Sequence, residues 1–158
     1  MNSLVQSQFP VLKETMDLRD QLMENLTDAD LQYKLPGNNP TLGAICHGMG
    51  DIQQSYIDSF KTLKQDWAYH CDDPTLATSI DALKKWYAQL DANFLKTLEE
   101  LSEEDIQTAI IDRSPEQFPV VIQMHVYREA LLIFYGKVVT YFHAMEKPIP
   151  PKVIMWIG

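Results

Sequence analysis

Hydrophobic residues recur every three or four positions in four long segments of the chain, which is the spacing of an amphipathic helix. The four segments are residues 11–26, 41–62, 79–101 and 118–146. Thr41 and Ser79 open the second and third segments, and both residue types are favoured at the N-cap of a helix. The pattern therefore predicts four helices that are long enough to pack against one another.

The last of these segments is the longest and the most apolar. It has no proline after Pro119 and a single glycine, so it predicts one helix of about seven turns at roughly 3.6 residues per turn. One side of this helix is expected to face the core and holds Tyr127, Ala130, Phe134, Val138, Tyr141 and Met145. The opposite side holds His125, Arg128, Glu129, Gly136, Thr140 and His143.

A weak internal repeat relates the two halves of the chain. The sequence ENLTDADLQ at residues 24–32 is similar to EELSEEDIQ at residues 99–107, and each copy lies between two predicted helices. Thr27 and Asp30 have the spacing of a capping box. We therefore expect two helical hairpins that form an all-α four-helix bundle with long connections, as one domain over residues 1–158.

The segment after Glu146 is predicted to be an extended C-terminal tail. Pro148, Pro150 and Pro151 prevent a helix from continuing through its start. The apolar residues 153–156 then follow, and such a patch is costly to leave in water. We expect this end of the chain to pack on the body of the bundle or on a second subunit.

The charge of the chain argues against several classes of partner. Its 22 acidic and 13 basic residues give a formal charge of -9, which repels nucleic acids and anionic membranes. No apolar run approaches the ~18 residues of a membrane span. Two cysteines are too few for a disulfide framework, and the first twelve residues lack the pattern of a secretory signal, so we expect a cytoplasmic protein.

Candidate chemistry centres on His47, in the middle of the second predicted helix. Very small residues surround it, namely Gly43, Ala44, Gly48 and Gly50. Because each glycine costs a helix interior about 1 kcal/mol relative to alanine, this composition predicts that something approaches that face closely. Asp51 follows His47 by one helical turn and is a cleft candidate, and His125 with Glu129 repeats the spacing on the fourth helix.

At this point the chain resembles the DinB/YfiT-like superfamily of four-helix bundles. The similar stretches are PTLGAICHGMGDIQQSYI at residues 40–57 and FYGKVVTYFHAMEKPIP at residues 134–150. The resemblance implies a divalent metal held by one histidine of the second helix and an H-x-x-x-H pair of the fourth. His47 matches the first ligand. Ala130 and Phe134 occupy the positions of the pair and cannot bind a metal, so this resemblance implies a degenerate site.

Three hypotheses for function follow. The first is a DinB-like small-molecule binding or accessory protein that lacks the three-histidine metal site and has no cofactor. The second is a divalent-metal-dependent thiol transferase or hydrolase, in which His47, His125 and Glu129 bind Zn²⁺ or Ni²⁺. The third is a structural or partner-binding homodimer, favoured by the apolar fourth helix and tail.

No residue is singled out as catalytic by a nucleophile motif. The chain contains neither the phosphate-binding pattern G-x-x-x-x-G-K-[ST] nor the hydrolase pattern G-x-S-x-G. Cys46 lies inside a predicted helix without basic neighbours in sequence, which favours a small buried side chain over a reactive thiol. Whether the protein is an enzyme is therefore left open by its sequence.

Overall fold

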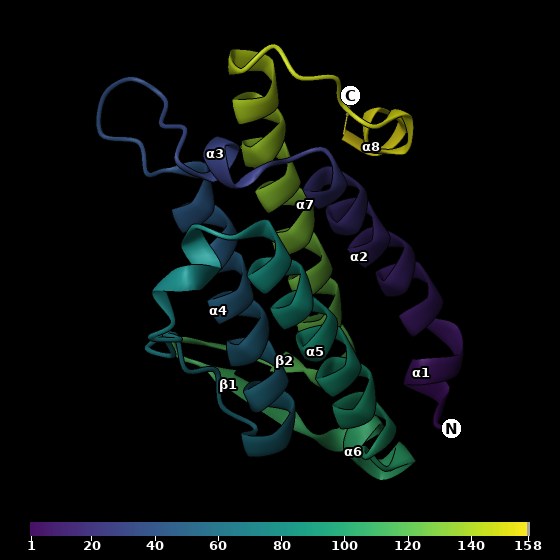
Figure 1. Ribbon diagram of the computed structural model, residues 1–158. Coiled ribbons are helices and arrows are strands. Elements are labelled where there is room, and N and C mark those ends of the chain that lie inside the picture. Colours follow the sequence, from purple (N-terminus) through teal and green to yellow (C-terminus); the bar gives the residue numbers. More distant parts are fainter. Residues whose placement is uncertain (158) are drawn as a thin grey trace.

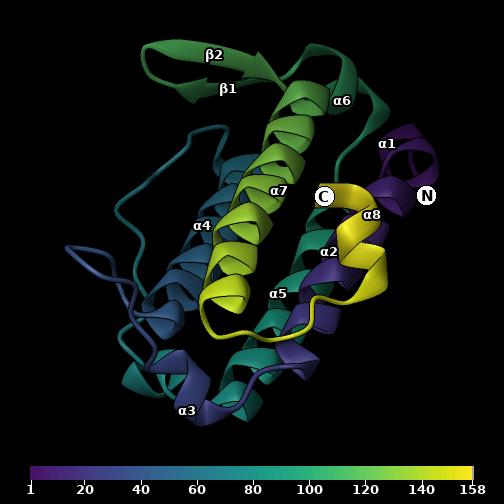
Figure 2. The same ribbon diagram turned by 90° about the horizontal axis from the view of Figure 1, so that it is seen from above.

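Four long helices form the body of the molecule in the computed structural model, which describes residues 1–157. They are α2 (Phe9–Glu24), α4 (Leu42–Thr62), α5 (Ile80–Glu99) and α7 (Val120–Ala144). The helices α2 and α4 each contact both α5 and α7, which gives a four-cornered bundle (Figure 1). Seen from above, α7 lies between α4 on one side and α2 on the other (Figure 2). The predicted all-α fold is confirmed.

Polar caps set where the helices begin. Thr41 and Ser79 accept hydrogen bonds from the backbone N–H groups of Ala44 and Ala82, so α4 and α5 start where the sequence predicts. Both copies of the internal repeat form complete capping boxes. They open two short helices, α3 (Asp28–Leu31) and α6 (Glu103–Thr108).

The connections contain more regular structure than the sequence indicates. A short helix, α1 (Ser3–Ser7), precedes α2, and a 3₁₀ turn, η1 (Pro74–Ala77), precedes α5. Between α6 and α7 the chain forms an antiparallel hairpin of β1 (Ile110–Arg113) and β2 (Glu116–Pro119). Residue 118, which was expected to begin the fourth helix, therefore belongs to a strand.

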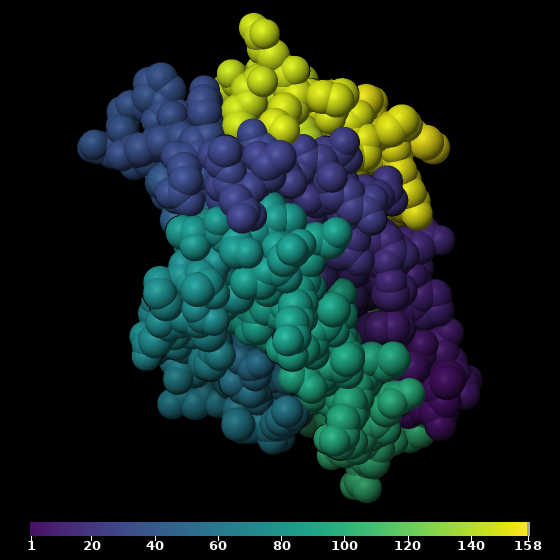
Figure 3. Space-filling view, in the orientation of Figure 1, coloured from purple at the N-terminus to yellow at the C-terminus, as the bar shows by residue number. Residues whose placement is uncertain are grey.

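The tail also differs from the extended segment that was expected. After a non-helical stretch it forms α8 (Pro151–Ile157), which contacts α2 and α7. The Val153 side chain is fully buried, and the Arg128 guanidinium lies 5.5 Å from the centre of the Trp156 ring. Figure 3 shows this yellow segment against the purple and blue N-terminal part. Docking on the body is thus confirmed, and Pro151 is compatible with α8 because the first helical turn needs no N–H donor there.

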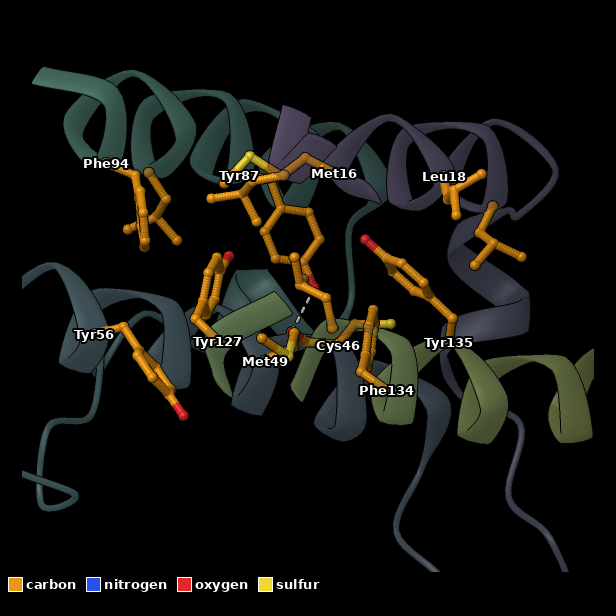
Figure 4. Close-up of a cluster of buried hydrophobic side chains, with 14 of the residues drawn as sticks. Met16, Leu18, Cys46, Met49, Tyr56, Tyr87, Phe94, Tyr127, Phe134 and Tyr135 are labelled. Carbon is orange, nitrogen blue, oxygen red and sulfur yellow. Dashed lines mark hydrogen bonds between the residues drawn. The ribbon is translucent and has the colours of Figure 1, made fainter. Parts of the chain in front are cut away.

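The core lies between the four long helices. Figure 4 shows Tyr87 from α5, and Tyr127 and Tyr135 from α7, reaching into this space. Most of the predicted core side of the last helix is buried, whereas His125, Glu129, Thr140 and His143 are exposed. The division of α7 into an inner and an outer side is therefore confirmed, although Ala130 and Met145 are only partly buried.

A charged network that the sequence did not indicate crosses this core. Arg19 is fully buried and donates hydrogen bonds from Nη1 to Gln53 Oε1 at 2.8 Å and from Nη2 to Asp91 Oδ2 at 2.6 Å. Its guanidinium lies 4.1 Å from the centre of the Tyr87 ring. Burial, the largest single influence, lowers the pKa of Arg19, but the Asp91 carboxylate and the tyrosine side chains around the guanidinium together hold that pKa above its ordinary value. Arg19 therefore stays charged inside the bundle.

Among residues 1–157, none of the helices combines the length and the apolar character that crossing a membrane requires.

Candidate metal centre

The small-residue face of α4 is in close contact with two neighbouring elements. An added Cβ at Gly43 would overlap the carbonyl oxygen of Ala77 in η1, and one at Gly50 would overlap the Trp86 ring of α5. The predicted close approach is confirmed at these two glycines. His47 lies between them in sequence, and Trp86 of α5 contacts its imidazole.

The His47 ring is enclosed by side chains from outside α4. The ring stacks on His70, with centroids 5.1 Å apart, and meets the edge of Trp86 at 5.5 Å. Only 8% of the His47 surface is exposed. Tertiary contacts with α5 and with the loop after α4 therefore bury a residue that an isolated helix would leave in water.

One nitrogen of this buried ring has no partner. Within residues 1–157, three buried side-chain atoms lack a hydrogen bond, and they belong to Arg19, His47 and Tyr127. Arg19 and Tyr127 are fully enclosed in the core, whereas His47 belongs to a group of potential metal ligands. The nearest oxygen of Asp51 is 3.7 Å away, which is too long for a hydrogen bond. A buried polar atom left in this way requires an explanation.

Asp51 ties the following loop to α4. Its Oδ2 lies 2.8 Å from Nδ1 of His70, and its Oδ1 accepts a hydrogen bond of 3.0 Å from the backbone N–H of Cys71. The start of the same loop is attached to the hairpin, where the N–H of Gln65 donates to the carbonyl of Asp112 at 2.8 Å. The loop that carries His70 is therefore held at two places.

These contacts gather three potential metal ligands. One donor atom each from His47, Asp51 and His70 lies within 4.8 Å of the other two, and this is the one such group in the described part of the chain. Two donors bound to one tetrahedral zinc ion at about 2.1 Å lie ~3.4 Å apart, so the donor atoms would have to approach one another by up to ~1.4 Å. The His70 side chain is 61% exposed, which leaves one side of the group open to solvent.

The predicted ligands His47, His125 and Glu129 and the cleft candidate Asp51 fall in different places. His47 and Asp51 belong to the group, whereas His125 and Glu129 are exposed on α7 and do not gather with His47 in this way. His125 lies beside the start of α2, in a small hollow that also includes Gln8. Helix geometry explains the separation, because both residues lie on the side of α7 that faces away from the core. His70 lies in a loop, and no spacing in sequence links it to His47.

The positions that the family resemblance assigns to the metal form a different feature. Ala130 and Phe134 line an apolar groove between α4 and α7, and His47 is not among the residues around it. Neither side chain has a donor atom, so the three-histidine set does not fit this chain. The cysteine beside His47 offers no ligand either, because burial raises the pKa of Cys46 from 9.0 to about 12. Cys46 is thus a small buried side chain, as predicted.

Comparison with known proteins supports the four-helix-bundle fold described above. A family model described as the DinB superfamily matches residues 12–133. No curated protein matches the chain. A DinB-like protein from Bacillus cereus ATCC 10987 has a similar structure, with a TM-score of 0.71, 19% sequence identity, and coverage of 90% of this chain and 93% of the other. A DinB-like protein from Bacillus subtilis, YjoA, is also similar in structure. Its TM-score is 0.70 and its sequence identity is 14%, and the match covers 94% of this chain and 96% of the other. Both similarities concern the fold.

Proposed function

The chain belongs to the DinB superfamily, and we propose that it binds a divalent transition metal through its own ligand set of His47, Asp51 and His70. The observation that carries this proposal is the unpartnered Nε2 of a histidine that is 92% buried and belongs to a group of three potential metal ligands. A metal ion would supply the partner that this atom lacks. The set replaces the three-histidine arrangement that Ala130 and Phe134 rule out.

The chemistry of the donors favours particular metals. Imidazole nitrogens suit zinc and nickel, and two histidines with one carboxylate leave coordination positions open. A metal bound with an open position lowers the pKa of a bound water or thiol, which is the basis of hydrolase and thiol-transferase activity. Because His70 is exposed, a small substrate could reach that position from solvent. We infer a metal-dependent enzyme of one of these two classes.

The surrounding residues support each ligand. His47 and Asp51 are one turn apart on a rigid helix, so their relative position is set by α4. The Cys71 N–H holds one Asp51 oxygen, as hydrogen bonds around metal sites commonly orient a ligating carboxylate. Trp86 covers the edge of His47 and restricts its ring. His70 is the most exposed of the three side chains, so rotation of its ring, without movement of the loop, would close the last gap.

Zinc titration of the untagged protein, followed by calorimetry, tests the proposal. We expect one Zn²⁺ per chain, and at least ~100-fold weaker binding in His47→Ala and in His70→Ala, because loss of even an outer-shell partner costs about 10–100-fold. His125→Ala and His143→Ala are matched controls, since both remove an exposed histidine from α7. They should bind zinc as the unaltered chain does.

Other outcomes would assign the site differently. If His125→Ala and Glu129→Ala weakened zinc binding while His70→Ala did not, the ligands would be His47, His125 and Glu129. If no stoichiometric zinc were bound at all, the expectation of a metal-free small-molecule binding or accessory protein would stand in place of the proposal. In that case the contact between Asp51 and His70 would only fasten the loop to α4.

The homodimer expected from the sequence stays a prediction. The apolar side chains that favour it are exposed on α8, where Met155 is 84% and Ile154 is 49% accessible. Light scattering at micromolar concentration should then return twice the chain mass of 18.2 kDa. Met155→Glu should shift that mass toward the monomer, and a monomeric unaltered chain would exclude the dimer at this concentration.

A further inference from the structure

A second hollow lies on α4 away from the metal ligands. It is an open groove between α4 and α7 with a volume of about 290 Å³. Its lining is apolar except for one residue, and consists of Ala44, Ile45, Gly48, Met49, Ile52, Ala130, Ile133, Phe134 and Lys137. Because His47, Asp51 and His70 are absent from this lining, the groove is separate from the candidate metal centre.

Gly48 is the feature of the groove that internal packing does not explain. The glycines at 43 and 50 are required by close contacts with Ala77 and Trp86, but a Cβ at Gly48 would meet no atom within 4 Å. Glycine weakens a helix interior relative to alanine, and nothing inside the chain calls for it here. The absence of a side chain at Gly48 leaves space in the groove.

Lys137 gives the groove its only charge. No acidic residue lines the groove, and the ion pairs formed within residues 1–157 do not include Lys137. The apolar wall beside Lys137 is exposed to solvent, since Ile133 is 63% accessible. An apolar wall that ends in a free ammonium group is complementary to a molecule with a hydrocarbon part and one negative charge.

We propose that this groove binds a medium-chain aliphatic monocarboxylate, with the hydrocarbon chain between α4 and α7 and the carboxylate on Lys137. The volume of 290 Å³ holds roughly ten non-hydrogen atoms at ~30 Å³ each, the volume of a water molecule in the liquid, which is about the size of octanoate. Burial of the chain removes the apolar wall from water, and the ammonium group selects the acid over the amine.

Calorimetric titration with octanoate tests the proposal, with octylamine and hexanoate as comparison ligands. We expect saturable octanoate binding and at least ~10-fold weaker binding of octylamine. Hexanoate lacks two methylene groups and should bind about 15-fold more weakly, from ~0.8 kcal/mol per buried methylene. Lys137→Gln should weaken octanoate binding about tenfold and leave the binding of neutral octanol unchanged.

Two matched glycine substitutions test whether octanoate binds in this groove. Gly48→Leu should abolish octanoate binding, because the added side chain fills the groove and its Cβ meets no atom within 4 Å. Gly136→Leu is the control, since a Cβ there also meets nothing within 4 Å but Gly136 does not line the groove. Circular dichroism should show both variants folded, and both should retain the zinc binding of the unaltered chain.

The proposal is overturned if octanoate shows no saturable binding up to ~10 mM, or if Gly48→Leu binds it as Gly136→Leu does. It is also overturned if light scattering shows that Gly48→Leu converts a dimer into a monomer, because a second copy of the chain would then occupy the groove. Zinc binding and octanoate binding are measured separately, so failure of one leaves the other intact.

Discussion

Asp91→Ala is expected to lower the free energy of unfolding by about 3–5 kcal/mol, because it leaves the buried charge of Arg19 without its carboxylate. The two side chains are 2.6 Å apart, with Arg19 at 0% and Asp91 at 18% exposure, so solvent can replace little of the lost interaction. Asp91 also accepts a hydrogen bond of 2.8 Å from Gln53 Nε2. Urea unfolding followed by circular dichroism measures the change.

Two further variants separate the unpaired charge from the loss of contacts. Arg19→Met combined with Asp91→Leu removes both charges and should be much closer in stability to the unaltered chain, because well-packed apolar residues often replace a buried ion pair without loss. Glu100→Ala breaks an exposed pair with Lys96 and should cost under ~1 kcal/mol. An Asp91→Ala variant that unfolded like Glu100→Ala would show that Arg19 finds another partner or water.

The second large effect is expected from Gly43→Ala, which should destabilise the fold by about 2–3 kcal/mol. Its Cβ would overlap the carbonyl of Ala77 and lie 3.0 Å from the carbonyl oxygen of Leu31. Both neighbours are backbone groups, so relief requires η1 to move away from α4, with a smaller adjustment of α3. For a chain of this length, such a loss should lower the melting temperature by about 4–12 °C.

Gly48→Ala is the matched control for this prediction, since it makes the same change in the same helix. A Cβ at Gly48 meets no atom within 4 Å, so the substitution should stabilise the protein by about 0.5–1 kcal/mol. If Gly43→Ala lowers the stability and Gly48→Ala raises it, then contacts, and not helix propensity, determine the effect of the substitution at Gly43. Equal stabilisation of both variants would mean that η1 is not held against α4 in solution.

Local signals explain why the helices could be predicted from the sequence. The spacing of apolar residues and the polar caps at Thr41 and Ser79 are contained within each segment, so they need no knowledge of tertiary structure. The hairpin of residues 110–119 was missed because Pro115 interrupts it and Phe118 continues the apolar pattern of α7. The helix α8 was missed because its prolines argue against a helix without forbidding one that starts at Pro151.

Only part of the candidate site could be predicted, for a related reason. His47 and Asp51 are visible because their spacing places them on one face of a helix. His70 lies in a loop 19 residues after Asp51, and only the folded chain brings it to Asp51. The buried charge of Arg19 was hidden as well, because a charged residue on an amphipathic helix is normally taken to face solvent.

The attachment of the loop to the hairpin and to Asp51 has a consequence for affinity. With Gln65 held by Asp112 and His70 held by Asp51, the chain between them has already given up most of its conformational freedom before any ion arrives. Binding of a metal ion by these side chains would therefore carry a small entropic penalty. The strength of binding could then be tuned from the two-stranded hairpin, by residues that never touch the ion.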